Sequence, residues 1–172
     1  VMEWIVRNAE QYHLDPDRII LVGDSAGAQL ASQYAAIATN PAYAAAFRMT
    51  VPDITVRALG LNCGMYNPKV FLANGTSGIT RDYMGKTADL EDPCLQILEA
   101  IGSNYPAAHI TTAHHDFLKD HAQPMYDFLT GKQIGLATAS DFSTFEDFFT
   151  AVKKQLIFLS EKAMEITDLY ER

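Results

Sequence analysis

The sequence predicts an α/β protein, a three-layer α/β/α sandwich built on a mostly parallel sheet, and two observations support this. Apolar runs of five to nine residues alternate with longer segments of helical periodicity, which is the pattern of βαβ units. The runs are apolar along their whole length, as expected of strands that helices cover on both faces. With 172 residues, 48% of them hydrophobic, the chain can bury one core, and we expect residues 1–172 to form a single domain.

The strands are predicted from the apolar runs, and we expect them to be parallel neighbours in one sheet. They cover residues 19–23, 56–64 and 107–113, and a weaker candidate covers residues 132–138. Helices are predicted at residues 1–14, 26–41, 92–103, 117–131 and 144–166. Asp92 and Pro93 are the start signals of the third helix, and Gly131 is expected to close the fourth.

The last predicted helix has the most regular period in the chain. Its apolar residues recur at i, i+3, i+4 and i+7, so they should form one stripe that docks on the core. The residues of this stripe are Phe145, Phe148, Phe149, Val152, Leu156, Leu159 and Ala163.

Residues 65–91 have several glycines and no steady period, and we interpret them as a loop with short helices, a lid or pocket-lining insertion. The apolar residues in this segment have two possible roles: they shape a pocket for an acyl or alcohol group, or they cover the core. These residues are Met65, Tyr66, Phe71, Leu72, Tyr83 and Met84.

Charge and composition exclude several classes of function. A formal net charge of −8 argues against a nucleic-acid or anionic-membrane partner, because either needs a basic face. No apolar stretch approaches the roughly 20 residues that span a bilayer. The two cysteines, Cys63 and Cys94, form no C-x-x-C pair, so we expect no disulfide framework, no metal site and no cofactor. This cysteine usage favours a reducing, cytoplasmic setting.

The sequence G-D-S-A-G, which comprises Gly23, Asp24, Ser25, Ala26 and Gly27, lies between a predicted strand and a predicted helix. In this context G-x-S-x-G is typical of a nucleophile elbow, a sharp turn that lifts the serine Oγ above the sheet edge. Gly23 and Gly27 are expected where a side chain would collide with neighbouring backbone. The Ala26 N–H, at the helix N-terminus, is the expected oxyanion donor. The alternative is a glycine-rich turn of a nucleotide-binding α/β fold.

The segment "DPDRIILVGDSAGAQLA" resembles the nucleophile-elbow region of the α/β-hydrolase fold. More narrowly, it is similar to the esterase and lipase branch related to hormone-sensitive lipase and the bacterial acetyl esterases. The segment "AAHITTAHHDFLKDHAQPMYDFLTG" is similar to the strand, acid turn and helix that carry this family's catalytic aspartate, with Asp116 in the matching position. Together the matching segments span residues 1–131.

The resemblance implies a serine carboxylester hydrolase that acts on small acyl esters, such as acetyl esters, through an acyl-enzyme on Ser25. Asp116 would be the acid that orients the base, although an aspartate at this position could also simply cap the following helix. The partner would be a small-molecule ester, and a homo-oligomer is left open. Two alternatives remain: a catalytically silent hydrolase-fold binding protein and a serine peptidase of the same fold.

The general base is not found where the resemblance places it. The family's histidine lies between the last strand and the final helix, where this chain has "ATASDFSTFED", with Ser140 or a neighbour at the matching position. Elsewhere, His13 is expected in an exposed turn and His109 in a buried strand. His114 and His115 precede Asp116 and are candidates to line the site, but they share its short backbone. We expect His121 on the surface.

A second departure from the resemblance lies at the start of the chain. The family's H-G-G-G oxyanion loop and first strands stand upstream of the elbow, and the residues before Ser25 contain neither. The sequence therefore predicts the C-terminal part of a larger hydrolase, or a truncated product whose exposed sheet edge something else must cover.

Overall fold

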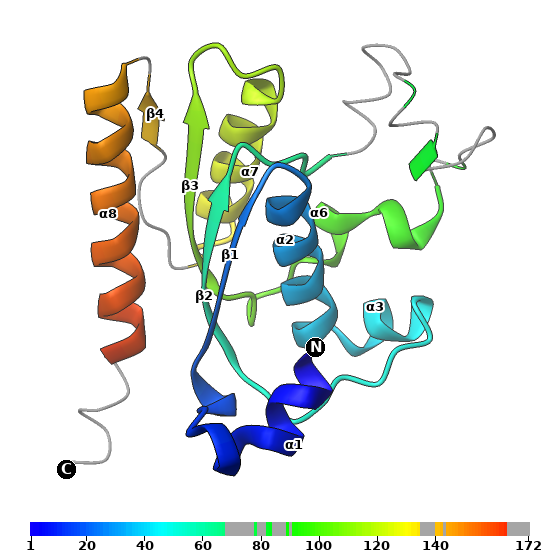
Figure 1. Ribbon diagram of the computed structural model, residues 1–172. Coiled ribbons are helices and arrows are strands. Elements are labelled where there is room, and N and C mark those ends of the chain that lie inside the picture. Colours follow the sequence, from blue (N-terminus) through cyan, green and yellow to red (C-terminus); the bar gives the residue numbers. More distant parts are fainter. Residues whose placement is uncertain are drawn as a thin grey trace.

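A computed structural model describes residues 1–67, 78, 82–83, 89, 91–134, 140–142 and 144–164. Within these residues the sheet has four strands in sequence order, β1-β2-β3-β4, and every neighbouring pair is parallel (Figure 1). The strands are β1 (Ile19–Asp24), β2 (Val56–Asn62), β3 (Ala107–Ala113) and β4 (Ser140–Phe142). The predicted parallel neighbours at 19–23, 56–64 and 107–113 are therefore confirmed.

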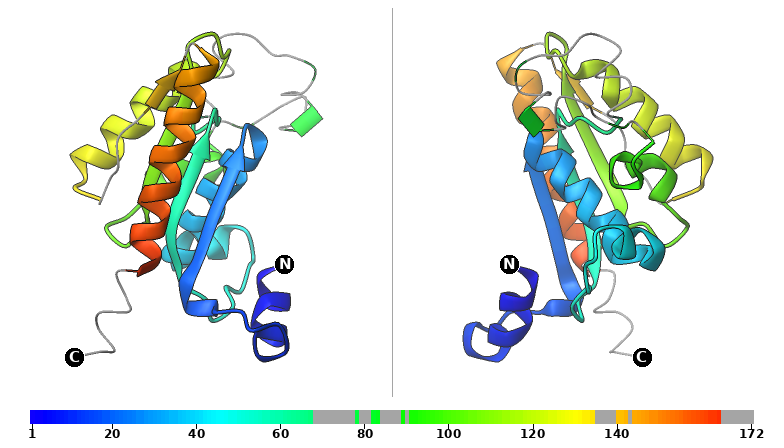
Figure 2. Two further views of the ribbon diagram at one scale, coloured as in Figure 1. Left: turned by 60° about the vertical axis from the view of Figure 1, so that its left-hand side comes forward. Right: turned by 90° about the vertical axis from the view of Figure 1, so that its right-hand side faces the viewer.

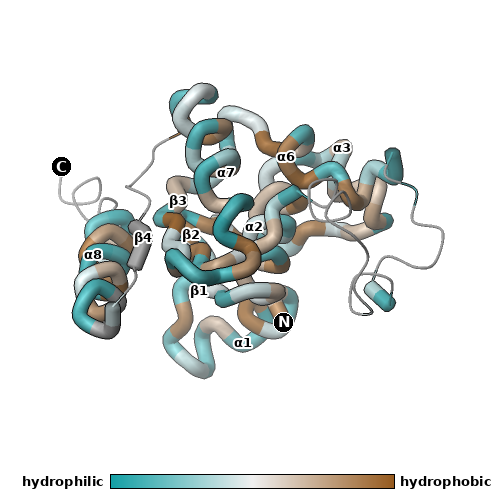
Figure 3. The backbone as a smooth tube through the Cα atoms, turned by 90° about the horizontal axis from the view of Figure 1, so that it is seen from above, coloured by the Kyte–Doolittle hydropathy of each residue, from teal (hydrophilic) through white to brown (hydrophobic). Residues whose placement is uncertain are grey.

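Helices form a layer on each face of the sheet (Figures 2 and 3). On one face α2 packs on β1 and β2, and α7 packs on β3. On the other face α8 packs on β2, β3 and β4. The α-helices are α1 (Met2–Tyr12), α2 (Ala26–Thr39), α3 (Pro41–Ala46), α6 (Ile97–Ala100), α7 (Lys119–Gly131) and α8 (Phe145–Met164), with 3-10 turns at Pro16–Arg18 and Pro93–Leu95. The three-layer α/β/α sandwich predicted from the sequence is confirmed.

The main core lies between the sheet and the layer of α2, α3, α6 and α7. Alternate residues of β2 and β3 point into it, as the two-residue period of a strand requires. Its fully buried large side chains include Leu59, Leu61, Ile110, Met125 and Leu129. A second, smaller cluster lies under α8 and consists of Ala58, Phe158 and Leu159.

Helix α8 differs from the prediction in the face that it buries. Among the side chains described in α8, the buried ones are Ala151, Gln155, Phe158 and Leu159. Leu159 faces the sheet as predicted, whereas Phe149 and Leu156, also predicted to face the core, are 56% and 62% exposed. Gln155 donates from Nε2 to Asn62 Oδ1 over 2.9 Å, and a Cβ on Gly60 would come within 3.1 Å of its Cδ. The residues of the sheet beneath this part of α8 are small and polar. A glutamine therefore packs there, although the period of apolar residues alone predicted leucine.

Strand β1 is an edge strand within the described sheet, and it is only partly covered, although its apolar sequence predicted burial on both faces: α2 packs on one face, and Ile20 packs against the cluster under α8 on the other. Its residues are half-buried or exposed, and the Val22 side chain is 57% exposed. Its backbone pairs with β2 from Ile19 to Asp24, with one irregularity after Ile19.

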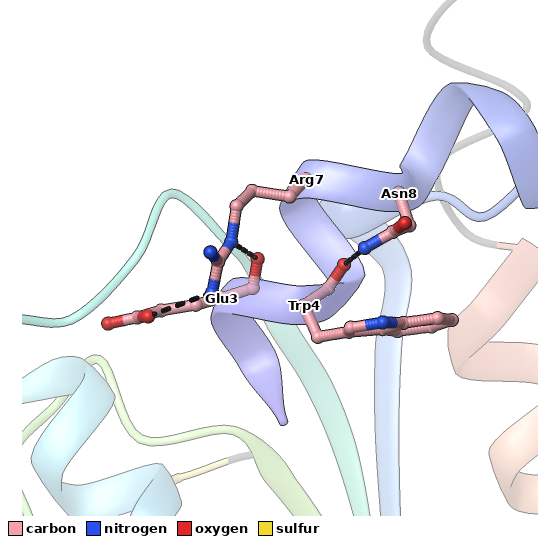
Figure 4. A network of polar contacts seen from close by, with 4 residues as sticks. All are labelled: Glu3, Trp4, Arg7 and Asn8. Atoms are coloured by element: carbon pink, nitrogen blue, oxygen red, sulfur yellow. Dashed lines mark hydrogen bonds and ion pairs between the residues drawn. The ribbon is translucent and has the colours of Figure 1, made fainter.

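Helix α1 contributes no buried residue. Its side-chain polar contacts shown in Figure 4 are local: Arg7 forms an ion pair with Glu3 at 3.3 Å, and Asn8 Nδ2 donates to the Trp4 carbonyl over 2.7 Å. Both charged side chains are about 70% exposed, and exposed pairs of this kind contribute little to stability.

Three further predictions need correction. The helix predicted at 92–103 is a 3-10 turn, capped by Asp92 as expected, followed by α6, because Gln96 leaves helical geometry between them. Gly131 is still helical, and Gln133, at φ 56°, is the left-handed residue that ends this region. Residues 132–134 form no strand, and the rest of the strand predicted at 132–138 lies outside the described residues.

Candidate active site

Ser25 stands in a strained strand-to-helix turn. It follows β1 directly, caps α2 and has φ 53° and ψ −117°, a backbone conformation that L residues rarely adopt. Three hydrogen bonds hold it there: its N–H donates to the Asn62 carbonyl over 2.9 Å, and its own carbonyl accepts from Ala28 N and Gln29 N at 3.1 Å each. This is the geometry that G-x-S-x-G predicted between a strand and a helix.

The two glycines of the elbow have different roles. A Cβ on Gly23 would lie 2.2 Å from both the carbonyl carbon and oxygen of Gly27, so the strand and the helix approach too closely for any side chain. A Cβ on Gly27 would meet nothing within 4 Å. The predicted collision is correct for Gly23 and wrong for Gly27, whose Cβ direction points away from neighbouring backbone.

The start of α2 offers hydrogen-bond donors beside Ser25. The first N–H groups of an α-helix have no intrahelical acceptor, and in α2 these include the N–H groups of Ala26 and Gly27. Ser25 is half-buried and Ala26 is exposed, so a ligand can approach this end of the helix. The positive end of the helix dipole lies at the same place.

The register of the strands places Ser25 and Asp116 at the same end of the sheet, where β1, β2 and β3 have their carboxyl ends. Asp24 is level with Asn62, and Asn62 is level with Thr111, so all three strands end together (Figure 1). Asp116 follows β3 by three residues at this same edge. Open parallel sheets place their binding sites at the carboxyl ends of strands.

Asp116 also makes local hydrogen bonds in the turn before α7. Its Oδ1 accepts a hydrogen bond of 2.6 Å from Leu118 N, just before α7, and its N–H donates to the Ala113 carbonyl over 3.0 Å. This bond reaches the N-cap residue Leu118, and α7 has no side-chain cap hydrogen bond, so Asp116 supports the turn before α7 and does not cap the helix itself. A carboxylate accepts at both oxygens, so this bond does not use up its capacity to orient a base.

Cys63, which no sequence motif marks, lies between Ser25 and Asp116, because β2 lies between β1 and β3. It follows β2, the middle strand of the three, with φ 48°, and its N–H donates to the Thr111 carbonyl over 2.8 Å. Burial first, and then the neighbouring charge of Asp116, raises the pKa of Cys63 to about 11. The rule that parallel strands have their carboxyl ends together could have found this residue, because it lies at the end of the strand predicted at residues 56–64.

The Cys63 thiol gives a direct test of this geometry. Because its pKa is raised, we expect slow alkylation by iodoacetamide at pH 8 and a rate that increases as the pH rises toward 11. Asp116→Asn removes a negative charge that disfavours the thiolate, so alkylation of Cys63 at pH 8 should become several-fold faster. Peptide mass spectrometry measures the rate, with Asp120→Asn as the control, since Asp120 is exposed in α7. An unchanged rate in Asp116→Asn would contradict the placement of Asp116 beside this thiol.

The histidines are placed as predicted with one exception. His13 is exposed, and His109 is 1% exposed in β3, where burial and then the charge of Lys154 lower its pKa. His114 and His115 are exposed in the turn before Asp116, with ring centroids 4.8 Å apart. His121 was predicted on the surface but is 4% exposed, because its face of α7 packs inward with Ala122 and Met125, and burial lowers its pKa.

The loop that should carry the base is short. Ser140, at the position matching the family's histidine, begins β4, which pairs with β3 through Thr111. Only residues 143–144 separate β4 from α8, and neither is histidine.

Only part of the predicted lid segment is described. Tyr66 is 1% exposed and belongs to the main core, which favours the core-covering interpretation for this residue. Tyr83 is 54% exposed, and its hydroxyl accepts a hydrogen bond of 2.9 Å from Gln29 Nε2. Phe71, Leu72 and Met84 lie outside the described residues. Among the residues that the structure describes, no group of three or more His, Cys, Asp or Glu could hold a metal ion, and no helix is long and apolar enough to cross a membrane.

A parallel sheet that presents a serine on a strained turn before a helix is the arrangement of the α/β hydrolases. Residues 1–140 match the model of the family described as alpha/beta hydrolase fold, and the chain belongs to this family. No curated protein matches the chain.

The chain is similar to solved structures of esterases. Esterase B from Lactobacillus rhamnosis has a TM-score of 0.78 and 16% identity, with 98% of this chain and 60% of that chain covered. The same esterase in a structure with a tributyrin phosphonate has a TM-score of 0.75 and 17% identity, with 98% and 60% covered. A carboxylesterase from Lactobacillus plantarum has a TM-score of 0.68 and 17% identity, with 83% and 50% covered. At these identities the likeness is one of fold, and the chain spans between 50% and 60% of the length of these proteins.

Proposed function

We propose that the chain is the nucleophile-bearing part of a serine carboxylester hydrolase that acts on small acyl esters. The observation that carries this proposal is the backbone of Ser25, at φ 53° and ψ −117° between β1 and α2. Such strain costs on the order of 1–3 kcal/mol, and it persists where the surrounding structure over-determines it, which is typical of functional residues. A glycine at position 25 would adopt the same φ without that cost.

Each assigned residue has a defined task in acyl transfer. The Ser25 Oγ attacks the ester carbonyl carbon, the Oγ–C bond forms, and the former carbonyl oxygen becomes an oxyanion that the Ala26 N–H stabilises. The alcohol then leaves with a proton, and water releases the acid from the acyl-enzyme by the same route. Asp116 would orient the base that accepts the Ser25 proton. No residue described at the strand ends supplies a histidine in the family's position for that proton.

The proposed substrates are short acyl esters, acetyl esters among them. Support comes from the solved structures, which are described as esterases and carboxylesterases, one of them inhibited with a tributyrin phosphonate. The acidic net charge also suits a small neutral ester better than an anionic polymer. We further propose a reducing, cytoplasmic setting, since Cys63 and Cys94 are both free thiols.

Phosphonylation of Ser25 tests the proposed function. With free imidazole supplied as a base, a fluorophosphonate should modify Ser25 in preference to the other serines, because the oxyanion donor at the start of α2 stabilises the developing charge there. Intact mass and peptide mapping should find a single adduct on Ser25, none in Ser25→Ala, and an unchanged adduct in Ser160→Ala, where the replaced serine is exposed on α8. An unlabelled chain, or labels spread over several serines, would contradict the assignment.

A second candidate is a catalytically silent hydrolase-fold protein that binds a ligand at the same edge. The observation that favours it is the two-residue connection between β4 and α8, which lacks a histidine. A silent protein should leave Ser25 unmodified by the fluorophosphonate, so the same experiment separates the two candidates.

A further inference from the structure

The peptide group between Asn62 and Cys63 connects the three strands that end at the candidate site. Its carbonyl accepts the hydrogen bond of 2.9 Å from Ser25 N, just beyond β1, and its N–H donates to the Thr111 carbonyl of β3 over 2.8 Å. A rarely adopted backbone conformation persists only where the surrounding structure over-determines it. The strained turn at Ser25 therefore depends on the position of this one peptide group.

This peptide group lies at the end of a strand, where regular pairing stops. Asn62 is the last residue of β2, and Cys63 turns away from the strand with φ 48°, in the left-handed region. Backbone at the end of an element opens more readily than backbone in its middle. A side chain that anchors Asn62 therefore has a direct effect on where the carbonyl of this residue lies.

Gln155 of α8 anchors the Asn62 side chain. Its Nε2 donates to Asn62 Oδ1 over 2.9 Å, and Gln155 is only 6% exposed. Breaking a buried hydrogen bond of this kind leaves a polar group without a partner, so the bond strongly favours one arrangement of the two side chains. Helix α8 packs along this face of the sheet (Figure 2), so the bond ties the end of β2 to a helix of 20 residues.

The sheet leaves room for the glutamine at Gly60. Gly60 and Asn62 are two positions apart in β2, so both face α8. A Cβ on Gly60 would lie 3.1 Å from Gln155 Cδ and 3.2 Å from its Nε2, which is tighter than ordinary van der Waals contact. The glutamine amide therefore lies over the backbone of Gly60, and a side chain at position 60 would displace it from Asn62.

Two other polar side chains on this face of the sheet do not anchor α8. In the pairing of β2 with β3, His109 is level with Gly60 and Thr111 is level with Asn62, so both lie next to the place that Gln155 covers. Both ring nitrogens of His109 and the Thr111 Oγ1 are buried without a hydrogen-bond partner among the described residues. Gln155 differs from these two side chains because its donor has a partner in the sheet.

From these contacts we propose that Gln155 is a positioning residue for Ser25. It fixes Asn62, and the Asn62 carbonyl in turn holds the Ser25 N–H and with it the strained turn. The inference rests on the proposed function, in which Ser25 is the nucleophile. Gln155 acts through Asn62 and takes no step of the reaction itself, so a helix on the face opposite α2 contributes to the geometry of the elbow.

The rate of fluorophosphonate modification at Ser25, with free imidazole supplied, tests this role in Gln155→Met. Methionine is unbranched and of similar length but lacks the amide, so it should fill the same space and lose the bond to Asn62. We expect the rate at Ser25 to fall at least about fivefold, because a small displacement of a reacting group lowers a rate steeply.

Phe158→Leu is the matched control for Gln155→Met. Phe158 is 8% exposed on the same face of α8 and packs in the cluster with Ala58 and Leu159, so its replacement weakens the packing of α8 and leaves the bond to Asn62 intact. The rate at Ser25 should stay within about twofold of that of the unmodified chain, since this variant loses packing alone.

A double variant tests whether the effect passes through Asn62. Asn62→Ala keeps the carbonyl that binds Ser25 and removes the side-chain acceptor, so it should slow the modification of Ser25 as Gln155→Met does. Because both substitutions break the same hydrogen bond, Gln155→Met/Asn62→Ala should be no slower than the slower single variant, whereas independent effects would multiply.

Amide exchange measured by NMR gives a readout that does not depend on the reactivity of Ser25. In Gln155→Met the exchange rate of the Ser25 N–H relative to that of Leu59, in the middle of β2, should rise at least about tenfold, whereas a general loss of stability would accelerate both. If Ser25 of the unmodified chain does not react, the proposed function is contradicted, and the exchange ratio still decides the role of Gln155. An unchanged exchange ratio, a rate at Ser25 that Gln155→Met leaves unchanged or that Phe158→Leu lowers equally, or multiplied effects in the double variant would overturn the positioning role.

Discussion

Gly23→Ala is expected to destabilise the protein more than any other single substitution at the elbow. The added Cβ would lie 2.2 Å from the carbonyl carbon and oxygen of Gly27 and 2.6 Å from Ala28 N. These are backbone atoms of α2, which is packed on β1 and β2, so they cannot move without separating the helix from the sheet. We expect a loss of at least about 4 kcal/mol in the free energy of unfolding.

Gly27→Ala is the matched control for this prediction. Its Cβ would meet no atom within 4 Å, and alanine is the better helix former, so stability should change by less than about 1 kcal/mol and in the stabilising direction. Urea unfolding followed by circular dichroism measures both variants. Equal stability of Gly23→Ala and Gly27→Ala would show that the close approach of β1 and α2 is wrong.

The sheet and the elbow could be predicted from the sequence because their signals are local. β1, β2 and β3 are short apolar runs between turn residues, and G-x-S-x-G following the first of them fixes where its strand must end. The apolar runs alone do not show whether a strand lies at the edge of the sheet or in its middle. The residues of β1 are as apolar as those of β2, yet β1 lies at an edge of the described sheet and β2 in its middle.

The faces of the helices were harder to predict, because a helix face is decided by what it packs against. The sequence of α8 has apolar residues on more than one face of the helix. The sheet beneath has small and polar residues, Gly60 and Asn62 among them, and the face that contains Gln155 packs on them. The same reason explains His121, whose place on the inner face of α7 depends on the core beside Met125.

The candidate site was predicted in part. Ser25 has a local signature, and Asp116 could be placed because it follows a strand whose direction was clear. Cys63 was missed because no motif marks it. Cys63 lies near Ser25 and Asp116 because β2 pairs with both β1 and β3, and all three strands have their carboxyl ends at the same end of the sheet.

The second large effect is expected in the reactivity of Ser25. A serine hydroxyl without a base is a weak nucleophile, and the loss of one triad member lowers catalysis by about four orders of magnitude. The chain has no histidine in the connection between β4 and α8. Free imidazole should therefore act as a substitute base, held between Asp116 and the Ser25 Oγ, and accelerate modification of Ser25 at least about tenfold.

The most direct test of the account is the rate of fluorophosphonate modification at Ser25 with and without free imidazole, measured by peptide mass spectrometry. Mass spectrometry follows the serine itself, so direct reaction of imidazole with the reagent does not disturb the readout. We predict acceleration by imidazole in the unmodified chain and in Asp120→Asn, and its loss in Asp116→Asn. A rate at Ser25 that imidazole leaves unchanged, or an acceleration that survives in Asp116→Asn, would contradict the assignment of Ser25 and Asp116 as nucleophile and acid of one triad.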